Sequence, residues 1–284
     1  MTDDRKVWFI TGASRGLGLE IAKAALSAGD RVVATGRNAD AVAKALPETD
    51  DAVALQLDVT DAGQADAAAA KAVDHFGRID VLVNNAGYGQ LGVFEEIEHD
   101  KIVRQFDTNV HGTLHVTRAV LPTMRAQKAG HIFNLSSIGG ALGFDIASIY
   151  CATKFAVEGF SECLALEVKP FNIGVTIVQP GFFRTDFLDD SSIRFADRPI
   201  SDYAEYAKAT QGFYQSQNHA QAGDPAKLGA ALVRLSREDE APLRYAAGSD
   251  AFEYLSSAYD ARKDELSKWQ DLSKSTDREA ASAA

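Results

Sequence analysis

Short apolar runs rich in β-branched residues alternate with longer amphipathic stretches along most of the chain. Short continuous apolar runs bounded by turn residues are typical of strands buried on both faces of a sheet. The predicted strands lie at 6–11, 31–35, 52–57, 80–83, 131–135, 173–178 and 243–247.

The intervening stretches carry apolar residues at helical spacing. In the stretch 16–28, for example, Leu17, Ile21, Ala24 and Ala25 fall on one side, as expected of a helix packed against a sheet. The other predicted helices lie near 38–46, at 61–76, at 98–127, at 148–169, from Asp224 onward and from about Asp250 onward.

Strands separated by long helices predict right-handed crossovers and a parallel sheet. The predicted fold class is therefore α/β: a doubly wound, Rossmann-type parallel sheet flanked by helices on both faces, in a single domain over residues 1–284. Such a fold binds its ligand at the carboxyl ends of the strands, so the loops after the strands are where functional residues are expected.

The strand–helix rhythm loosens after residue 178. Residues 182–222 carry many aromatic residues among polar ones, and we predict a substrate lid there. These aromatic residues either bind an apolar substrate or pack the lid against the domain. They include Phe183, Phe187, Phe195, Tyr203, Tyr206, Phe213 and Tyr214. The tail from about residue 274 is small and polar and is expected to fray.

Composition narrows the range of partners. The net charge is −11, which argues against binding to nucleic acid or to an anionic membrane. Cys151 and Cys163 lie in one predicted helix, roughly 18 Å apart along its axis, too far apart for a disulfide. Because the histidines are scattered along the sequence, we expect no bound metal. Because no apolar segment is long enough to span a bilayer and the two cysteines cannot pair, we expect a cytoplasmic protein.

The loop after the first strand, residues 11–18, reads TGASRGLG. Glycines in such a turn let the backbone approach a pyrophosphate, which the free amides of the following helix stabilise. The spacing Gly-x-x-x-Gly-x-Gly differs from the common fingerprint Gly-x-Gly-x-x-Gly. With the preceding Thr11, it resembles the loop of the short-chain dehydrogenase/reductase family.

The tip of the second strand bears on which dinucleotide would bind. It reads TGRN at 35–38 and lacks the acid that would bind a ribose 2′-hydroxyl and select NAD. Arg15 and Arg37 could instead form a cationic clamp for a 2′-phosphate. In the family, basic residues at these positions accompany a preference for NADP. The alternative interpretation is that Arg15 and Arg37 are simply two solvated surface side chains.

Tyr150 and Lys154 lie four residues apart at the start of a helix and therefore share one face. We expect the ammonium to lower the tyrosine pKa from about 10 toward neutrality, where acid–base catalysis operates. Ser137, in the loop after the fifth strand, is placed to bind the substrate oxygen. The resemblance makes Ser136 the weaker candidate, because the family's spacing from serine to tyrosine matches Ser137. Both serines could instead cap a turn.

The resemblance to the family implies further roles. Asn109 would order a water for a proton relay through Lys154, completing a catalytic set of Asn109, Ser137, Tyr150 and Lys154. The residues implied to bind NADP(H) are Gly12, Ser14, Arg15, Gly16, Leu17, Gly18, Arg37, Asp58, Val59, Asn85, Ala86, Gly87, Tyr150, Lys154, Pro180, Gly181 and Thr185. Of these, Pro180, Gly181 and Thr185 resemble the segment that holds the nicotinamide and its carboxamide.

The predicted function is hydride transfer between NADP(H) and a carbonyl or alcohol, as a ketone reductase for an apolar or aromatic compound. The run PGFFRTDF and the later residues 248–251 resemble a subgroup with hydroxysteroid-dehydrogenase-like members. A sugar-nucleotide epimerase-like enzyme and a non-catalytic dinucleotide sensor are the alternatives. The resemblance also implies a homodimer or homotetramer joined through the helices at 98–127 and 148–169.

Overall fold

A parallel sheet forms the centre of the computed structural model, which describes residues 4–189 and 192–278. Within these residues the main sheet has seven strands in the order β3-β2-β1-β4-β6-β7-β9, and every pairing is parallel. Its strands are β1 (Val7–Ile10), β2 (Arg31–Gly36), β3 (Ala52–Gln56), β4 (Val81–Asn84), β6 (Gly130–Leu135), β7 (Ile173–Pro180) and β9 (Arg244–Ala247). The order reverses after β1–β3, as the predicted doubly wound topology requires, and the predicted fold class is confirmed.

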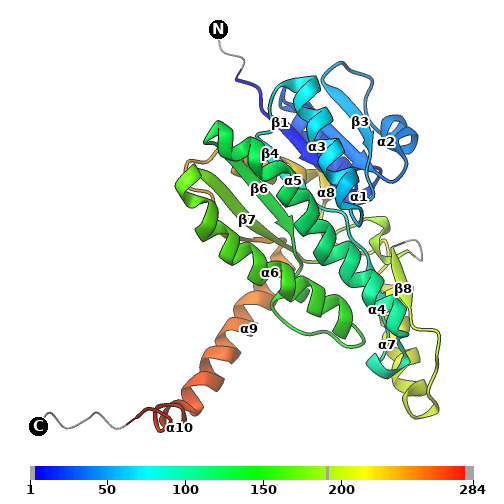
Figure 1. The fold of residues 1–284 in the computed structure, drawn as a ribbon. Coiled ribbons are helices and arrows are strands. Elements are labelled where there is room, and N and C mark those ends of the chain that lie inside the picture. The colour runs from blue at the N-terminus through cyan, green and yellow to red at the C-terminus, as the bar shows by residue number, and fades with distance from the viewer. Residues whose placement is uncertain (1–3, 190–191, 279–284) are drawn as a thin grey trace, which may run out of the picture.

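Helices cover both faces of the sheet (Figure 1). One face carries α3 (Ala62–Phe76), α5 (Gly112–Gln127) and α6 (Ser148–Val168), and the other carries α1 (Gly16–Ser27), α2 (Ala39–Ala45) and α8 (Pro225–Leu235). Strand β1 shows why its run is apolar throughout. Val7 and Phe9 pack into the hydrophobic core on the face covered by α3, α5 and α6, and Trp8 and Ile10 pack into the core on the opposite face.

The single helix predicted over 98–127 is divided in the structure. It consists of α4 (His99–Phe106), a π-helical turn η2 (Asp107–His111) and α5. The widened turn places Asn109 so that its side chain bonds to Tyr88 and Thr153. The prediction of one regular helix is therefore wrong at this point, because a tertiary contact reshapes the turn.

A second, two-stranded sheet was not predicted. It pairs β5 (Gly89–Leu91) in parallel with β8 (Ile193–Phe195), and joins the segment after β7 to the loop after β4. The same segment contains α7 (Ala204–Ser216), which lies toward one end of the molecule (Figure 1). Short 3₁₀ turns complete the connections: η1 (Phe94–Glu96), η3 (Ile138–Gly140), η4 (Lys169–Phe171), η5 (Asp186–Leu188) and η6 (Ser201–Tyr203).

The C-terminal helices extend away from the sheet (Figure 1). Helix α9 (Ser249–Lys268) buries only Ala251 and Leu255 and is followed by α10 (Gln270–Lys274). The tail predicted to fray from about residue 274 is thus still helical at Lys274, and residues 279–284 lie outside the described part. None of the described helices has the length and apolar character that a membrane crossing would need.

Candidate active site in the cleft at the strand ends

A cleft of about 810 Å³ opens at the carboxyl ends of the central strands. This is where a doubly wound sheet binds ligands. Residues from the loops after β1, β2, β3, β4, β6 and β7 line it, and the segment after β7 forms its outer wall. The site residues predicted from the sequence line this cleft, with two exceptions, Gly18 and Asn109.

Close contacts between backbones shape the loop after β1. Gly12 and Gly16 adopt φ angles of +66° and +59°, which residues with a Cβ seldom adopt. Gly18 lies one layer behind the cleft, where a Cβ would meet Gly12 O and Asn85 Nδ2 at 2.5 Å each. Gly18 therefore lets the loop pack against Asn85 and does not itself line the cleft.

Asn85 holds this loop in place. Its Nδ2 donates to the carbonyl oxygens of Thr11, at 2.9 Å, and Gly12, at 3.1 Å. The hydroxyl of Thr11 accepts from the backbone amides of Asn85 and Ala86, both at 3.0 Å. The loops after β1 and β4 thus form one rigid unit at the floor of the cleft.

We expect Gly18→Ala to lower the thermal midpoint of unfolding. The added methyl group has no room, and overpacking of this kind costs about 1–3 kcal/mol. Gly212→Ala is the matched control, because a Cβ at Gly212 in α7 meets nothing within 4 Å. That control should stabilise the protein slightly. Equal behaviour of the two variants in a thermal melt would contradict the close packing at Gly18.

The N-terminus of α1 lies at the cleft, which Gly16 and Leu17 line. The helix begins at Gly16, its N-cap residue Arg15 makes no side-chain cap, and its first turn holds no acidic residue. Free amides and the helix dipole favour an anion at this position. The loop and the helix start therefore fit the pyrophosphate of a dinucleotide.

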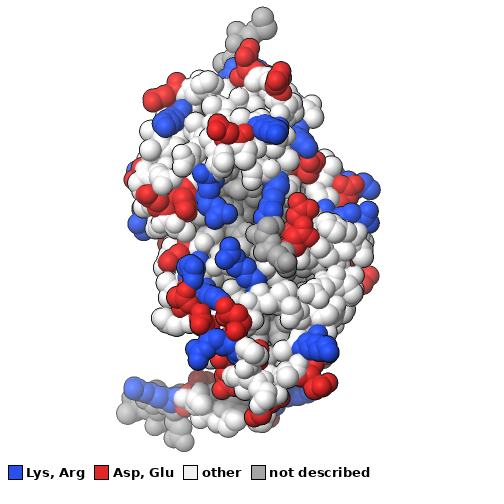
Figure 2. Space-filling model, turned by 90° about the vertical axis from the view of Figure 1, so that its right-hand side faces the viewer, with Lys and Arg blue, Asp and Glu red and all other residues white. Residues whose placement is uncertain are grey.

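Basic side chains border the cleft although the protein is acidic overall. Figure 2 shows Lys and Arg on both sides of a hollow in this face, and Arg15 and Arg37 are among the residues that line the cleft. Nη2 of Arg15 donates to Ser192 Oγ at 2.7 Å, so Arg15 also joins the cleft floor to the outer wall. No acid stands at the tip of β2, where Gly36 and Arg37 line the cleft.

Asp58 and Val59 line the cleft after β3. One carboxylate oxygen of Asp58 accepts from the backbone amide of Thr60 at 3.0 Å and from its hydroxyl at 2.8 Å. This turn fixes the carboxylate at the same end of the cleft as Arg37.

Tyr150, Ser137 and Lys154 come together at the other end of the cleft. Tyr150 and Lys154 lie in the first turns of α6, and Ser137 follows β6. Burial raises the pKa of Tyr150 to about 12, and a hydrogen bond with Ser137 opposes this shift. Ser136 Oγ is instead directed at the position of Gly140, where an added Cβ would lie 2.2 Å from it. The geometry thus favours Ser137 over Ser136 as the partner of Tyr150.

The predicted lowering of the Tyr150 pKa is wrong for the ligand-free protein. Lys154 Nζ lies 5.8 Å from the centroid of the Tyr150 ring and donates to Leu135 O at 2.7 Å. The loss of solvent around Tyr150 is the main cause of its raised pKa, since burial disfavours the charged form of a phenol. The phenol is therefore held protonated, as a proton donor must be.

Lys154 is itself buried, and burial lowers its pKa to about 8, while the Glu158 carboxylate one turn further along α6 opposes this. Glu158 accepts from Gln179 Nε2 at 3.0 Å and from Arg244 Nε at 3.1 Å. The sequence interpretation missed this support, although the spacing of Lys154 and Glu158, four residues apart on one helix, could have indicated it.

Asn109 lies behind the cleft and supports it. Its Nδ2 donates to Tyr88 O at 3.0 Å and to Thr153 Oγ1 at 3.1 Å, and its Oδ1 accepts from the Tyr88 amide at 3.1 Å. The side chain therefore links the loop after β4 to α6. Its predicted role in ordering a water stays a prediction.

The aromatic residues of the predicted lid divide into two groups. Phe183, Phe187, Phe195 and Tyr214 line the cleft, and the Phe187 ring lies 6.0 Å from the Tyr150 ring, centroid to centroid. The others face outward: the Tyr203 hydroxyl bonds to Glu95, the Tyr206 hydroxyl bonds to Asp145, and Phe213 is exposed. Some of the aromatics thus form the apolar wall and some anchor the segment.

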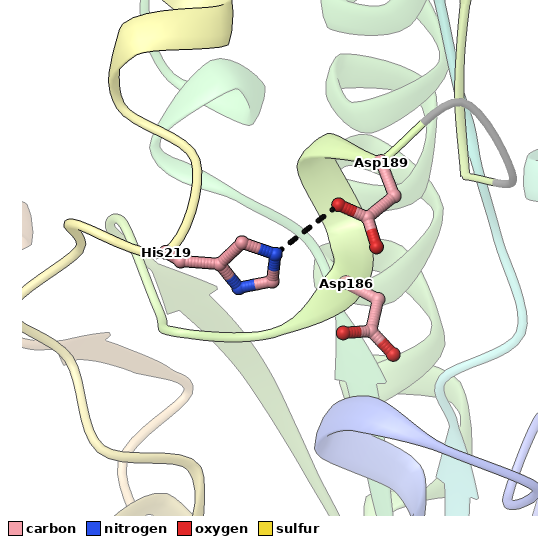
Figure 3. Close-up of side chains that lie close together, drawn as sticks. All are labelled: Asp186, Asp189 and His219. Carbon is pink, nitrogen blue, oxygen red and sulfur yellow. Dashed lines mark ion pairs between the residues drawn. The ribbon is translucent and has the colours of Figure 1, made fainter.

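Two carboxylates and an imidazole meet at the edge of this segment (Figure 3). The ligand atoms of Asp186, Asp189 and His219 all lie within 4.8 Å of one another, a spacing that a divalent cation could use. Asp189 already pairs with His219 at 3.4 Å and accepts from Asn218 at 2.6 Å. These contacts join η5 to the residues after α7, and we assign no metal to them.

Comparison with known proteins agrees with this geometry. The family described as short chain dehydrogenase matches residues 6–194. An oxidoreductase, BOA17, of Botryotinia fuckeliana is 39% identical, over 94% of this chain and 98% of its own. A 3-ketodihydrosphingosine reductase of Bacteroides thetaiotaomicron is 37% identical, over 86% and 88%. The crystal structure of a short-chain dehydrogenase from Streptomyces avermitilis superposes with a TM-score of 0.88 at 42% identity, covering 98% of this chain and 100% of that one.

Proposed function

The chain belongs to the short-chain dehydrogenase family, and from this premise we propose that it transfers a hydride between NADP(H) and a carbonyl or alcohol carbon. We further propose that it acts as a ketone reductase for an apolar or aromatic compound. Membership makes it an oxidoreductase; the cofactor preference and the substrate class are our proposals.

The observation that carries the proposal is the meeting of Ser137, Tyr150 and Lys154 in one cleft with the glycine loop of β1. When bound, the reduced nicotinamide supplies a hydride to the carbonyl carbon. Ser137 would hold the carbonyl oxygen by a hydrogen bond, and the protonated Tyr150 would donate its hydroxyl proton to that oxygen. Lys154 would supply positive charge beside the phenolate that remains.

Arg15 and Arg37 support a preference for NADP(H) over NAD(H). Guanidinium groups bind phosphate oxygens in a fork geometry, and Arg15 and Arg37 both line the cleft. The absence of an acid at the tip of β2 removes the group that would favour a free 2′-hydroxyl.

The wall near Tyr150 supports an apolar substrate. Leu91, Phe144, Phe187 and Ile193 line it and belong to one apolar cluster with Tyr150. Such a wall stabilises a hydrocarbon or an aromatic group next to the reacting carbonyl. A relative named for its action on 3-ketodihydrosphingosine agrees with a ketone as the reacting group.

The site and the family match argue against the two alternative functions, a non-catalytic dinucleotide sensor and an epimerase-like enzyme. A non-catalytic sensor has no need of the serine, tyrosine and lysine that this cleft brings together. An epimerase-like enzyme does not fit the match of residues 6–194 to the short chain dehydrogenase family.

The direct test is the consumption of NADPH by the purified protein with a panel of ketones and aldehydes, followed by alcohol oxidation with NADP⁺. We expect turnover with apolar or aromatic ketones and little with small hydrophilic ones. No turnover with any member of the panel in either direction would contradict the proposal.

The pH profile offers a separate test. The lowered pKa of Lys154, about 8, means that its positive charge is present below pH 8 and is lost as the pH rises through that value. Tyr150, with a pKa of about 12, stays protonated over the same range. We therefore expect kcat/KM for NADPH, which reports groups of the free enzyme, to fall above an apparent pKa near 8.

Lys154→Arg tests whether Lys154 is the group that causes the alkaline fall, because a guanidinium does not titrate in the accessible range. The alkaline fall should disappear in that variant, whatever its absolute rate. A fall with the same midpoint in the arginine variant would show that another group titrates.

We also propose a homodimer or homotetramer joined through α4–α5 and α6. Apolar side chains on these helices face outward: Val103 of α4 is 43% exposed, and Phe155 and Leu166 of α6 are 41% and 73% exposed. Light scattering that gives the mass of a single chain would contradict this.

A cytoplasmic location is proposed from the thiols. Cys151 and Cys163 are both free, as expected in a reducing compartment. Fractionation of the source cells would test it.

A further inference from the structure

Charged side chains follow one another at intervals of four residues along one side of α6. Lys154 and Glu158 are 8% and 7% exposed, whereas the side chain of Glu162 is 56% exposed. Arg244 of β9 pairs with both carboxylates, through Nε to Glu158 at 3.1 Å and through Nη2 to Glu162 at 2.8 Å. Because taking charges out of water offsets most of what their pairing contributes to stability, the burial of Lys154 and Glu158 beside the cleft indicates a function.

Three other segments hold the Glu158 carboxylate in place. Oε1 accepts from Nε2 of Gln179, a residue of β7 that is 2% exposed, at 3.0 Å. Oε2 accepts from Arg244 in β9. Glycine η3 residue Gly140 lies close by, since a Cβ there would meet Oε1 at 3.1 Å. Arg244 and Lys154 are charged groups that face this carboxylate, whereas Gln179 and Gly140 bring no charge.

The charge of Lys154 depends on this carboxylate. The groups beside the ammonium are otherwise neutral: Nζ donates to Leu135 O at 2.7 Å and lies 5.8 Å from the centroid of the Tyr150 ring, whose phenol is protonated. Burial lowers the pKa of Lys154 to about 8, and the negative charge of Glu158 opposes this shift. A charge one helical turn away acts strongly where water is excluded.

We propose that Glu158 is a positioning residue of the active site, which keeps Lys154 positively charged from a place that Gln179 and Arg244 fix. For its effect on catalysis, this inference rests on the proposed function. Once Tyr150 has given its proton to the carbonyl oxygen, a phenolate remains, and a nearby cation stabilises it. Because Gln179 and Arg244 occupy the Glu158 carboxylate, the Lys154 ammonium bonds to Leu135 O and stays close to Tyr150.

The test measures the charge of Lys154 directly in the full-length, ligand-free protein. The chemical shift of the lysine Cε changes when the ammonium loses its proton, so an NMR titration of ¹³C-labelled lysine follows each side chain. The signal of Lys154 is the one that Lys154→Arg removes. Glu158→Gln keeps the shape of the side chain and removes its charge, and it should lower the midpoint of the Lys154 titration by about one pH unit.

Two further variants separate charge from shape and from net charge. Glu158→Asp keeps the charge but shortens the side chain, so its midpoint should stay closer to the wild-type value than that of Glu158→Gln. Glu162→Gln is the matched control, because it removes a carboxylate from the same helix and from the same partner, Arg244. Water screens the exposed Glu162, so this control should move the midpoint by less than about 0.3 pH unit.

Activity gives a second readout that a merely structural glutamate would not show. In Glu158→Gln, the alkaline fall of kcat/KM for NADPH should move to lower pH together with the NMR midpoint. At a pH well below that midpoint Lys154 is charged in both proteins, so kcat/KM should be within about threefold of the wild-type value. A structural role would instead lower kcat/KM at every pH.

An unchanged Lys154 midpoint in Glu158→Gln, or an equal shift in Glu162→Gln, would overturn the assignment. If Glu158→Gln does not fold, Glu158→Met, which replaces the buried charge by an apolar side chain of similar size, should show the same lowered midpoint. The titration needs no substrate. A protein that shows the expected midpoints but consumes no NADPH with any carbonyl compound would contradict the proposed function and still support the link between Glu158 and Lys154.

Discussion

Tyr150→Phe is expected to reduce kcat for NADPH-dependent ketone reduction by about 10²–10⁴-fold, the usual contribution of a positioned proton donor. The substitution removes the hydroxyl that bonds to Ser137 and leaves the ring against Phe187. Because packing changes little, the Kd for NADPH and the thermal midpoint should stay nearly constant. Steady-state kinetics together with calorimetric titration separates the chemical step from binding.

Tyr254→Phe is a suitable control for this experiment. Tyr254 lies in α9 and does not line the cleft among the described residues, so the loss of its hydroxyl should leave kcat unchanged. If Tyr150→Phe keeps most of its activity, the proton must come from another group, and the scheme built on Tyr150 fails.

Arg37→Asp is expected to reverse the cofactor preference. The change removes a cation from the tip of β2 and places there the carboxylate that would bind a ribose 2′-hydroxyl. Hydrogen bonds between charged groups contribute about 1.5–3 kcal/mol, so kcat/KM with NADPH should fall about 10- to 100-fold. The value with NADH should hold steady or rise, and the ratio of the two is the quantity to measure.

Arg234→Asp supplies the same change in net charge away from the cleft and away from the proposed oligomer interface. Arg234 is an exposed residue of α8 and is not among the cleft-lining residues of the described chain. If both variants reduced the NADPH efficiency equally, the effect would be a general one of net charge. Equal efficiency of the wild-type protein with NADPH and NADH would also contradict the proposed preference.

The local features of the site were predictable because they depend on short sequence spacing. The alternation of apolar runs and amphipathic stretches determines which residues a sheet and its helices bury, and β1 is buried on both faces as its composition indicates. The glycine loop before α1 and the spacing of Tyr150 and Lys154 depend on backbone conformation within one turn. These features therefore needed no knowledge of distant residues.

The missed elements depend on partners distant in sequence. Strands β5 and β8 have three residues each, too few to show a period, and exist only because they pair with each other. The π-helical turn at Asn109 likewise depends on contacts with Tyr88 and Thr153. No pattern within 98–127 distinguishes it from a regular helix.

The sequence by itself determined the order of strands and helices, the loops at their ends and the identity of the Tyr150–Lys154 pair. Only the tertiary structure decided how these groups ionise and which polar groups are left without partners. The reason is physical: spacing along a helix tells which charge is near, whereas burial depends on every segment that packs around the group. That difference keeps the half-buried Tyr150 protonated and leaves the buried amide of Gln221 without a partner among the described residues.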